Sequence, residues 1–120
     1  MYDKKRLKHL LSSLINLVDS SESKYISGDY KGALIDKRIA RKIIIDNKNI
    51  IELESRYKEI IRSKIIKPSK YDLIQDYKKR IDDIKKKDII EILESKSESK
   101  YMSGDFKGAI IALRRAEKYY

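Results

Sequence analysis

Apolar residues recur at spacings of three, four and seven along most of the chain, which is the spacing of one face of an α-helix. Leu14, Leu17 and Tyr25, for example, share such a face. The pattern stops at Gly28 and again at Gly104, where a helix can end because glycine tolerates a left-handed backbone conformation. The pattern therefore predicts an all-α protein whose helices are joined by short turns.

One stretch of the sequence occurs twice, 76 residues apart. Residues 21–34 read SESKYISGDYKGAL and residues 97–110 read SESKYMSGDFKGAI, with eleven of fourteen letters identical. In each copy the turn glycine is followed by an aspartate, Asp29 or Asp105, whose side chain can cap the next helix. Each copy therefore predicts an antiparallel helical hairpin, with a tight turn between two helices.

The region between the two copies contains weaker helix signals. Residues 48–54 (KNIIELE) and 87–94 (KDIIEILE) both resemble helix starts, because Asn49 or Asp88 precedes an apolar pair and has a glutamate three residues later. Pro68 marks a turn between them. The chain is accordingly predicted to form three helix pairs of about 38 residues, half of the 76-residue repeat, with these spans: 4–27 with 29–46, 49–66 with 69–86, and 88–103 with 105–120.

A competing interpretation joins residues 29–66 into one long helix and residues 69–103 into another. Apolar spacing continues through Ile43, Ile50 and Tyr57, and no strong helix breaker lies between residues 46 and 50. Both interpretations treat residues 1–120 as a single helical domain. The first one divides that domain into approximate units, 4–46, 49–86 and 88–120.

The repeated motif resembles the tetratricopeptide repeat. It reads Tyr-x-x-Gly-Asp-(Tyr or Phe)-x-x-Ala, with a second alanine seven residues later, and consists of Tyr25, Gly28, Asp29, Tyr30, Ala33 and Ala40, and of Tyr101, Gly104, Asp105, Phe106, Ala109 and Ala116. The resemblance implies that these residues pack the two helices of a hairpin. The sequence departs from the family at Lys24 and Lys100, where a tyrosine is typical, and it lacks the closing proline in both copies.

The same turn also resembles that of microtubule-interacting-and-trafficking (MIT) domains, which are three-helix bundles. Residues 71–86, YDLIQDYKKRIDDIKK, look like the third helix of such a bundle. Members of both families bind peptide segments or helices of partner proteins. The resemblance therefore implies a protein-interaction function, by analogy of fold and not of a particular site.

Residues that could carry catalysis or bind a metal are scarce. The chain has no cysteine and a single histidine, His9, which we expect to face solvent because no partner groups lie near it in the sequence. Acidic residues such as Glu52, Glu54, Asp82 and Asp83 are better explained as partners of lysine and arginine on helix surfaces. We therefore expect no catalytic residue, metal ligand or cofactor, and we expect that the protein is not an enzyme.

No apolar run approaches the roughly 20 residues that are needed to cross a bilayer. The first eleven residues, MYDKKRLKHLL, have a basic start, but no signal-peptide core follows. We expect an intracellular, cytoplasmic protein with no transmembrane segment.

The chain is strongly basic, with a net charge of +10 and a pI of about 9.6. Such a balance favours an anionic partner, whether a nucleic acid, an acidic protein or an anionic membrane; the alternative is a solvated, lysine-rich surface without such a partner. The basic residues concentrate in the second helix of each predicted pair. The candidate contacts for an anionic partner are Lys37, Arg38, Arg41, Lys42, Lys78, Lys79, Arg114, Arg115 and Lys118.

Two hypotheses for the function follow, and the first is favoured. The protein is an adaptor that binds a segment of a partner protein, or it is a basic helical protein that contacts the phosphate backbone of DNA or RNA. Self-association is a further expectation, because Ile110, Leu113 and Tyr120 on the last helix could be covered by a second copy in a homodimer.

Overall fold

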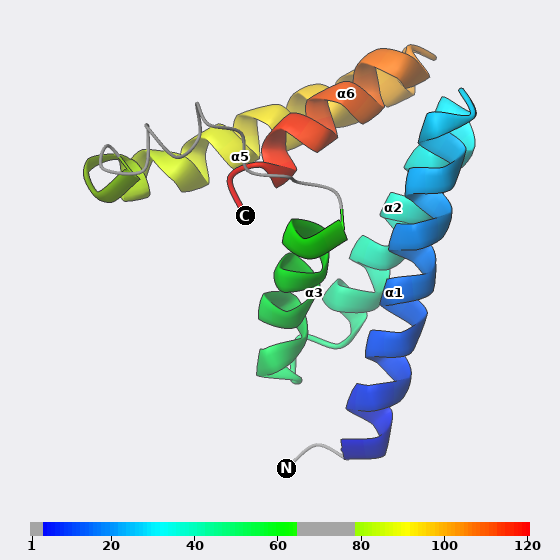
Figure 1. Ribbon diagram of the computed structural model, residues 1–120. Coiled ribbons are helices and arrows are strands. Elements are labelled where there is room, and N and C mark those ends of the chain that lie inside the picture. Colours follow the sequence, from blue (N-terminus) through cyan, green and yellow to red (C-terminus); the bar gives the residue numbers. More distant parts are fainter. Residues whose placement is uncertain (1–3, 65–78) are drawn as a thin grey trace. The chain divides into compact units, whose positions relative to one another are not determined.

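Helices make up the regular structure of residues 4–64 and 79–120, which are the part of the chain that the computed structural model describes. Side chains are described for these residues except 79–85. The helices in chain order are α1 (Lys4–Ile26), α2 (Tyr30–Asp46), α3 (Ile51–Lys64), α5 (Lys79–Met102) and α6 (Phe106–Glu117) (Figure 1). The predicted all-α class is confirmed for the described residues.

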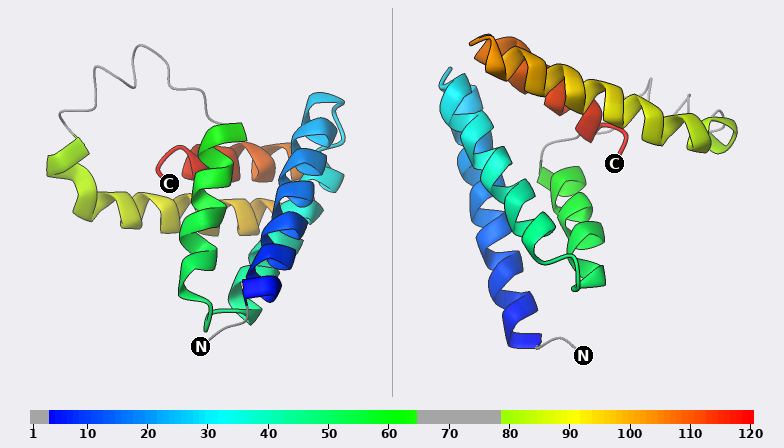
Figure 2. Two further views of the ribbon diagram at one scale, coloured as in Figure 1. Left: turned by 60° about the horizontal axis from the view of Figure 1, so that its bottom comes forward. Right: turned by 180° about the vertical axis from the view of Figure 1, so that it is seen from behind.

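The chain divides into two compact units, Met1–Ile65 and Ile66–Tyr120. In the first unit α1 and α2 lie side by side as a hairpin, and α3 packs against α1. In the second unit α5 and α6 lie side by side as another hairpin (Figure 2). Within the described ranges, no helix is long and apolar enough to span a membrane.

Aliphatic side chains from three helices form the core of the first unit. Leu14 of α1, Leu34 of α2, and Leu53 and Ile61 of α3 are buried almost completely. Leu53, Tyr57 and Ile61 follow one another at intervals of four residues, so they share one face of α3. Burying each such aliphatic side chain contributes about 2 kcal/mol, and this burial fixes α3 against the hairpin.

Both hairpins are closed by the same turn. Gly28 has a φ of 89° and Gly104 a φ of 87°, in the region that favours glycine. In the first hairpin the amide of Gly28 donates to the carbonyl of Tyr25 at 3.1 Å, and the amide of Asp29 donates to the carbonyl of Lys24 at 2.8 Å. These two bonds define a Schellman motif, which satisfies the last carbonyl groups of α1.

The aspartate after each glycine caps the second helix of its hairpin. The carboxylate of Asp29 accepts a hydrogen bond from the amide of Gly32, and that of Asp105 accepts one from the amide of Gly108, both at 3.0 Å. Each bond satisfies an amide in the first turn of a helix, where no carbonyl is in reach. In each hairpin a glycine therefore ends the first helix and the next residue, an aspartate, caps the second helix.

The two helices of each hairpin approach closely at a buried serine. The hydroxyl of Ser21 donates to the carbonyl of Ala33 at 3.0 Å, and that of Ser97 donates to the carbonyl of Ala109 at 2.7 Å. Next to the turn, an aromatic pair packs edge to face with ring centroids 5.7 Å apart in both hairpins, Tyr25 with Tyr30 and Tyr101 with Phe106. Ala33, Ala40, Ala109 and Ala116 are buried.

The interpretation of residues 29–66 as one helix is wrong, because α2 ends at Asp46 and α3 begins at Ile51. Asn47 makes three hydrogen bonds at the break between the two helices. Its side-chain amide donates to the carbonyl of Ile43 at 2.7 Å, its side-chain oxygen accepts from Arg6 at 2.7 Å, and its carbonyl accepts from the amide of Ile50 at 2.9 Å. An asparagine side chain thus replaces the helical hydrogen bonds at this position.

The helix start predicted at residue 88 is also wrong, because α5 runs without interruption from Lys79 to Met102. This helix contains no glycine, proline or asparagine. Asp88 therefore has no neighbour that would end a preceding helix. The predicted turn at Pro68, and residues 69–78 of the competing long helix 69–103, lie outside the described residues.

These boundaries change the assignment of the middle unit, 49–86. Its first part belongs to α3, in the unit Met1–Ile65, and its last residues belong to α5, in the unit Ile66–Tyr120. Three tandem hairpins of equal size are therefore not confirmed. Ile110, expected to be covered by a second copy of the chain, is fully buried in the single chain.

Candidate interaction surfaces

No described group of three or more His, Cys, Asp or Glu side chains converges in a way that could hold a metal ion. His9 lies exposed on α1. The described polar contacts join neighbouring helices or lie along the surface of α3. The surfaces that remain available for a function are those formed by exposed apolar and basic side chains.

The best-defined polar cluster is structural and lies between α1 and α2. Asp36 is only 7% exposed; its carboxylate accepts from the hydroxyl of Ser20 at 2.7 Å and lies 3.1 Å from the Lys24 ammonium group. A second ion pair, 3.0 Å long, links Lys64 of α3 to Asp19 of α1. Because the Asp36 carboxylate is bonded on both oxygens, its role is to join the two helices.

Most of the predicted basic contacts lie at the surface. Arg38, Arg41 and Lys42 are exposed on α2, and Arg115 and Lys118 are exposed at the end of α6, where Arg114 is half-buried. These basic residues lie on the second helix of each hairpin, α2 in the first and α6 with its C-cap in the second.

Three residues of the predicted basic set do not fit this description. Lys37 is only 4% exposed, so its side chain lies within the hairpin and not at the surface. Lys79 is the first residue of α5, but its side chain is outside the described part, and Lys78 lies outside it altogether. The prediction that Lys37 is a surface contact is wrong. Lys37 is adjacent to exposed Arg38 in the sequence, but one residue is a rotation of about 100° around the helix, which places Lys37 on the buried side.

Exposed isoleucines accompany the basic residues of α2. Ile35 is 39% exposed, Ile39 is 45% exposed and Ile45 is 52% exposed. The sequence analysis did not select these residues. The opposite face of α2 could have identified these isoleucines. Ala33, Leu34, Lys37 and Ala40 are buried, so residues on the other side of the helix face solvent.

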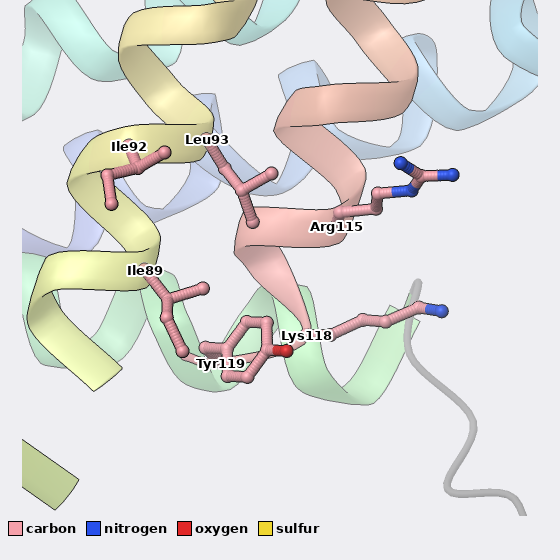
Figure 3. Close-up of a pocket in the computed structure, with 6 residues that line it drawn as sticks. All are labelled: Ile89, Ile92, Leu93, Arg115, Lys118 and Tyr119. Carbon is pink, nitrogen blue, oxygen red and sulfur yellow. The ribbon is translucent and has the colours of Figure 1, made fainter. Parts of the chain in front are cut away.

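The second hairpin carries an open groove of about 470 Å³ between α5 and α6. Ile89, Ile92 and Leu93 of α5 line it on one side, and Arg115, Lys118 and Tyr119 line it on the other (Figure 3). Ile89 and Tyr119 lie next to each other, whereas the charged ends of Arg115 and Lys118 extend away from the apolar side chains. The groove therefore has an apolar floor and a basic rim.

Two residues of the groove are notably accessible, since Ile92 is 66% exposed and Tyr119 is 38% exposed. Ile89 and Leu93 are partly buried. Sequence reasoning selects the basic residues of α6 but not Ile89 and Ile92, although both lie in the helix predicted at 88–103 and paired with 105–120. Helical periodicity does not by itself show which of these isoleucines are accessible.

The fold and these surfaces define a small helical protein built on two hairpins with related turns. Comparison of the chain with models of protein families, with curated proteins and with solved structures finds no match. Any functional conclusion therefore depends on the surfaces themselves.

Proposed function

We propose that the protein is a non-catalytic helical interaction module that binds a segment of a partner protein. The observation that carries this proposal is the groove between α5 and α6, with its apolar floor and its basic rim. Apolar surface that is gathered beside charged residues is typical of sites that bind other proteins. The sequence resemblance of the repeated motif to tetratricopeptide repeats and MIT domains implies the same class of partner.

The chemistry of the groove favours an acidic, amphipathic helix as the bound segment. Apolar side chains of that segment would cover Ile92 and Tyr119, and burial of each contributes about 1 to 2 kcal/mol. Carboxylates on the flank of the segment would face Arg115 and Lys118. Such rim charges mainly orient the segment and speed its association.

The test is a selection of helical peptides from a displayed library on the immobilised full chain, followed by binding measurements with the purified peptides. We expect the selected peptides to combine acidic and apolar residues at helical spacing. Ile92→Glu should weaken their binding by about tenfold or more, because it places a carboxylate among the contacts that the apolar and acidic groups of the peptide make.

The matched control is Ile51→Glu. Ile51 is 85% exposed, it is the first residue of α3, and it does not line the groove. An acidic residue in the first turn of a helix is well tolerated, so this variant should fold and bind as the parent chain does. The proposal is wrong if the library gives no binding peptide, or if Ile92→Glu and Ile51→Glu bind equally well.

A second candidate function is contact with the phosphate backbone of a nucleic acid. The observation that favours it is the exposure of Arg38, Arg41 and Lys42 on one helix of a chain with a net charge of +10. Binding of a DNA or RNA duplex should then fall steeply as salt is raised. Replacement of Arg38, Arg41 and Arg114 by glutamate should abolish it, with helicity checked by circular dichroism.

The protein partner is preferred because of the apolar side chains that lie among the cations. Exposed Ile35, Ile39 and Ile92 can contribute to a contact with an apolar side chain but not to a contact with a phosphate group. If a duplex shifts at low salt while no peptide is selected, the preference is reversed.

A further inference from the structure

The basic residues of the first unit are concentrated at one of its ends. Because α1 and α2 form an antiparallel hairpin, the first turns of α1 lie at the same end of the unit as the connection from α2 to α3 (Figure 1). A hydrogen bond of 2.7 Å from Arg6 to the side-chain oxygen of Asn47 joins these two segments directly. We call residues 4–9 and 41–52 together the basic pole.

The basic pole differs in charge from the opposite end of the same unit. It contains seven lysine and arginine residues against two acidic residues, whereas residues 19–36, around the turn between α1 and α2, contain two lysines against four acidic residues. The first unit therefore attracts anions to one end. The cations of the basic pole are all exposed: Lys4, Lys5, Arg6, Lys8, Arg41, Lys42 and Lys48.

Two isoleucines are exposed among these cations. Ile45, in the last turn of α2, is 52% exposed, and Ile51, the first residue of α3, is 85% exposed. Between them Asn47 and Ile50 are buried, so the connection itself is held in the unit while the two flanking isoleucines face solvent. A side chain as exposed as that of Ile51 stands above the surface and is not recessed in a groove.

Isoleucines that protrude between cations match the chemistry of an anionic bilayer. The phosphate and carboxylate groups of anionic lipids attract the cations, and the acyl chains beneath them accept an apolar side chain without a preformed pocket. A nucleic-acid backbone matches the cations but makes no apolar contact with the isoleucines. A peptide segment is better held in a groove, such as the one between α5 and α6, than on a protruding side chain.

We propose that the basic pole is a peripheral membrane-binding surface, with which the first unit docks on an anionic bilayer. Ile45 and Ile51 enter the boundary between headgroups and acyl chains, and the lysines of α1 and of the α2–α3 connection contact the headgroups. None of these residues lines the groove of the second hairpin, so the inference is independent of the proposed function and goes beyond it.

Both parts of the surface contribute to affinity. Each lysine or arginine near an anionic leaflet strengthens binding about fivefold, and this attraction is screened over about 8 Å in physiological salt. Insertion of each exposed isoleucine adds a factor of about five or more. Binding should therefore require anionic lipid, weaken with salt, and depend on the isoleucines as well as on the charge.

The first experiment is cosedimentation of the full chain with lipid vesicles. We expect binding to vesicles of phosphatidylcholine with about 30% phosphatidylserine, weaker binding as salt is raised, and no binding to phosphatidylcholine alone. Replacement of Lys4, Lys8 and Lys48 by glutamine should weaken binding about 100-fold. Ile45→Ser with Ile51→Ser should weaken it about tenfold or more.

The variants avoid cations that have other contacts. Lys5 and Arg41 interact with other groups of the chain, and Arg6 bonds to Asn47, so all three are left unchanged. A loss of vesicle binding is then not a consequence of a broken contact at these residues. Circular dichroism verifies that each variant retains the helicity of the parent chain.

The matched controls make the same changes outside the basic pole. Lys31, Lys87 and Lys96 are exposed, and their replacement by glutamine removes the same charge but should weaken binding by less than about twofold, because these residues are not in the pole. Ile26 and Met102 are 77% and 76% exposed, so Ile26→Ser with Met102→Ser removes comparable apolar surface and should leave binding unchanged.

A second experiment measures the insertion directly. The chain has no tryptophan, so Ile51→Trp introduces a single indole at the basic pole. Its emission should shift to shorter wavelength on the anionic vesicles, and lipids brominated on their acyl chains should quench it. Ile26→Trp, at the opposite end of the same unit, should show neither change.

Three outcomes would overturn the inference. Failure of the parent chain to bind the anionic vesicles would exclude a membrane surface. Equal losses in the pole variants and in their controls would show that only net charge matters. If a DNA duplex of about 20 base pairs binds while the emission of Ile51→Trp is unchanged on vesicles, the pole contacts nucleic acid instead. The peptide selection still decides the proposed function in each case.

Discussion

In the first hairpin the hydroxyl of Ser21 lies 3.0 Å from the carbonyl oxygen of Ala33, and in the second that of Ser97 lies 2.7 Å from the carbonyl oxygen of Ala109. The aromatic pairs beside the two turns have the same centroid separation of 5.7 Å and the same interplanar angle of 64°. The residues of the repeated stretch therefore build one local geometry twice. They do so although the rest of each hairpin has a different sequence.

The surroundings of the two hairpins are different. In the first, Asp36 lies between Ser20 and Lys24, and α3 packs against α1. In the second, Ala112 stands in place of Asp36. Leu14 is fully buried, whereas its equivalent, Ile90, is only half-buried. The turn and the serine hydrogen bond are thus common to both hairpins, whereas the other residues of each hairpin determine its further contacts, such as the packing of α3 on α1.

The largest effect is expected from proline at Ile51 or Ile90. These two isoleucines occupy the same place in the similar stretches KNIIELE (48–54) and KDIIEILE (87–94), but Ile51 is the first residue of α3 whereas Ile90 lies in the interior of α5. Ile90→Pro should destabilise the second unit by about 3 kcal/mol or more, because it removes a helical hydrogen bond and clashes with the preceding turn. Ile51→Pro should cost less than about 1 kcal/mol, because proline suits the first position of a helix.

Hydrogen exchange followed by mass spectrometry on the full chain measures this difference unit by unit. Amides of α5 and α6 should exchange faster in Ile90→Pro, while those of α1 and α2 should be unchanged. Equal losses at Ile51 and Ile90 would mean that the stretch 87–94 is not the interior of a continuous helix.

Local sequence was sufficient to predict the turns and the break after Asp46, but it also predicted a helix start at residue 88 that the structure does not have. Gly28 and Asp29 have defined conformational roles, so their positions can be read directly from the chain. At that break the side chain of Asn47 also accepts a hydrogen bond from Arg6, which is 41 residues away. Asp88 has a similar local sequence but no described contact of that kind, and the helix continues. The local sequence around residues 49 and 88 therefore does not show which of the two is near a helix start.

Some residues of the candidate site could likewise be predicted from the sequence, and others could not. The exposed basic residues Arg38, Arg41 and Lys42 of α2 and those of the groove rim, Arg115 and Lys118, could be found from the sequence, because any cation on a helix surface is a candidate. The apolar floor could not, because helical spacing places Ile89 and Ile92 on a helix but does not show that they are accessible beside Tyr119. The burial of Lys37 was equally out of reach, since it depends on how α2 is turned toward α1.

A smaller effect is expected at the serine contact between the helices. Ser21→Val should destabilise the first hairpin, and Ser97→Val the second, by about 2 kcal/mol each, because valine loses the hydrogen bond and adds volume to a tightly packed position. The matched controls are Ser23→Val and Ser99→Val, whose serines are exposed two residues further along the same helices. Urea unfolding monitored by circular dichroism measures the change, and equal effects at buried and exposed serines would contradict the prediction.

A smaller effect still should distinguish the two hairpins at Asp36. Asp36→Ala gives the first hairpin the residue that the second has at Ala112, and it should cost about 1.5 kcal/mol, because the carboxylate is nearly buried and accepts from both Ser20 and Lys24. The control is Asp46→Ala, since Asp46 is exposed at the end of the same helix. If Asp36→Ala is as stable as the parent chain in urea unfolding, the polar cluster contributes nothing.

The smallest effect should be the same in both hairpins. An added Cβ at Gly28 or Gly104 meets no atom within 4 Å, so the cost of Gly28→Ala or Gly104→Ala arises only from the positive φ and should be about 1 kcal/mol. Asparagine tolerates this conformation better than alanine, so Gly28→Asn should cost less than Gly28→Ala. Thermal unfolding with hydrogen exchange assigns each loss to its unit. Equal losses at Gly28 and Gly104 would show that the turn is independent of its surroundings, whereas a larger loss at Gly28 would mean that the packing of α3 on α1 depends on the first turn.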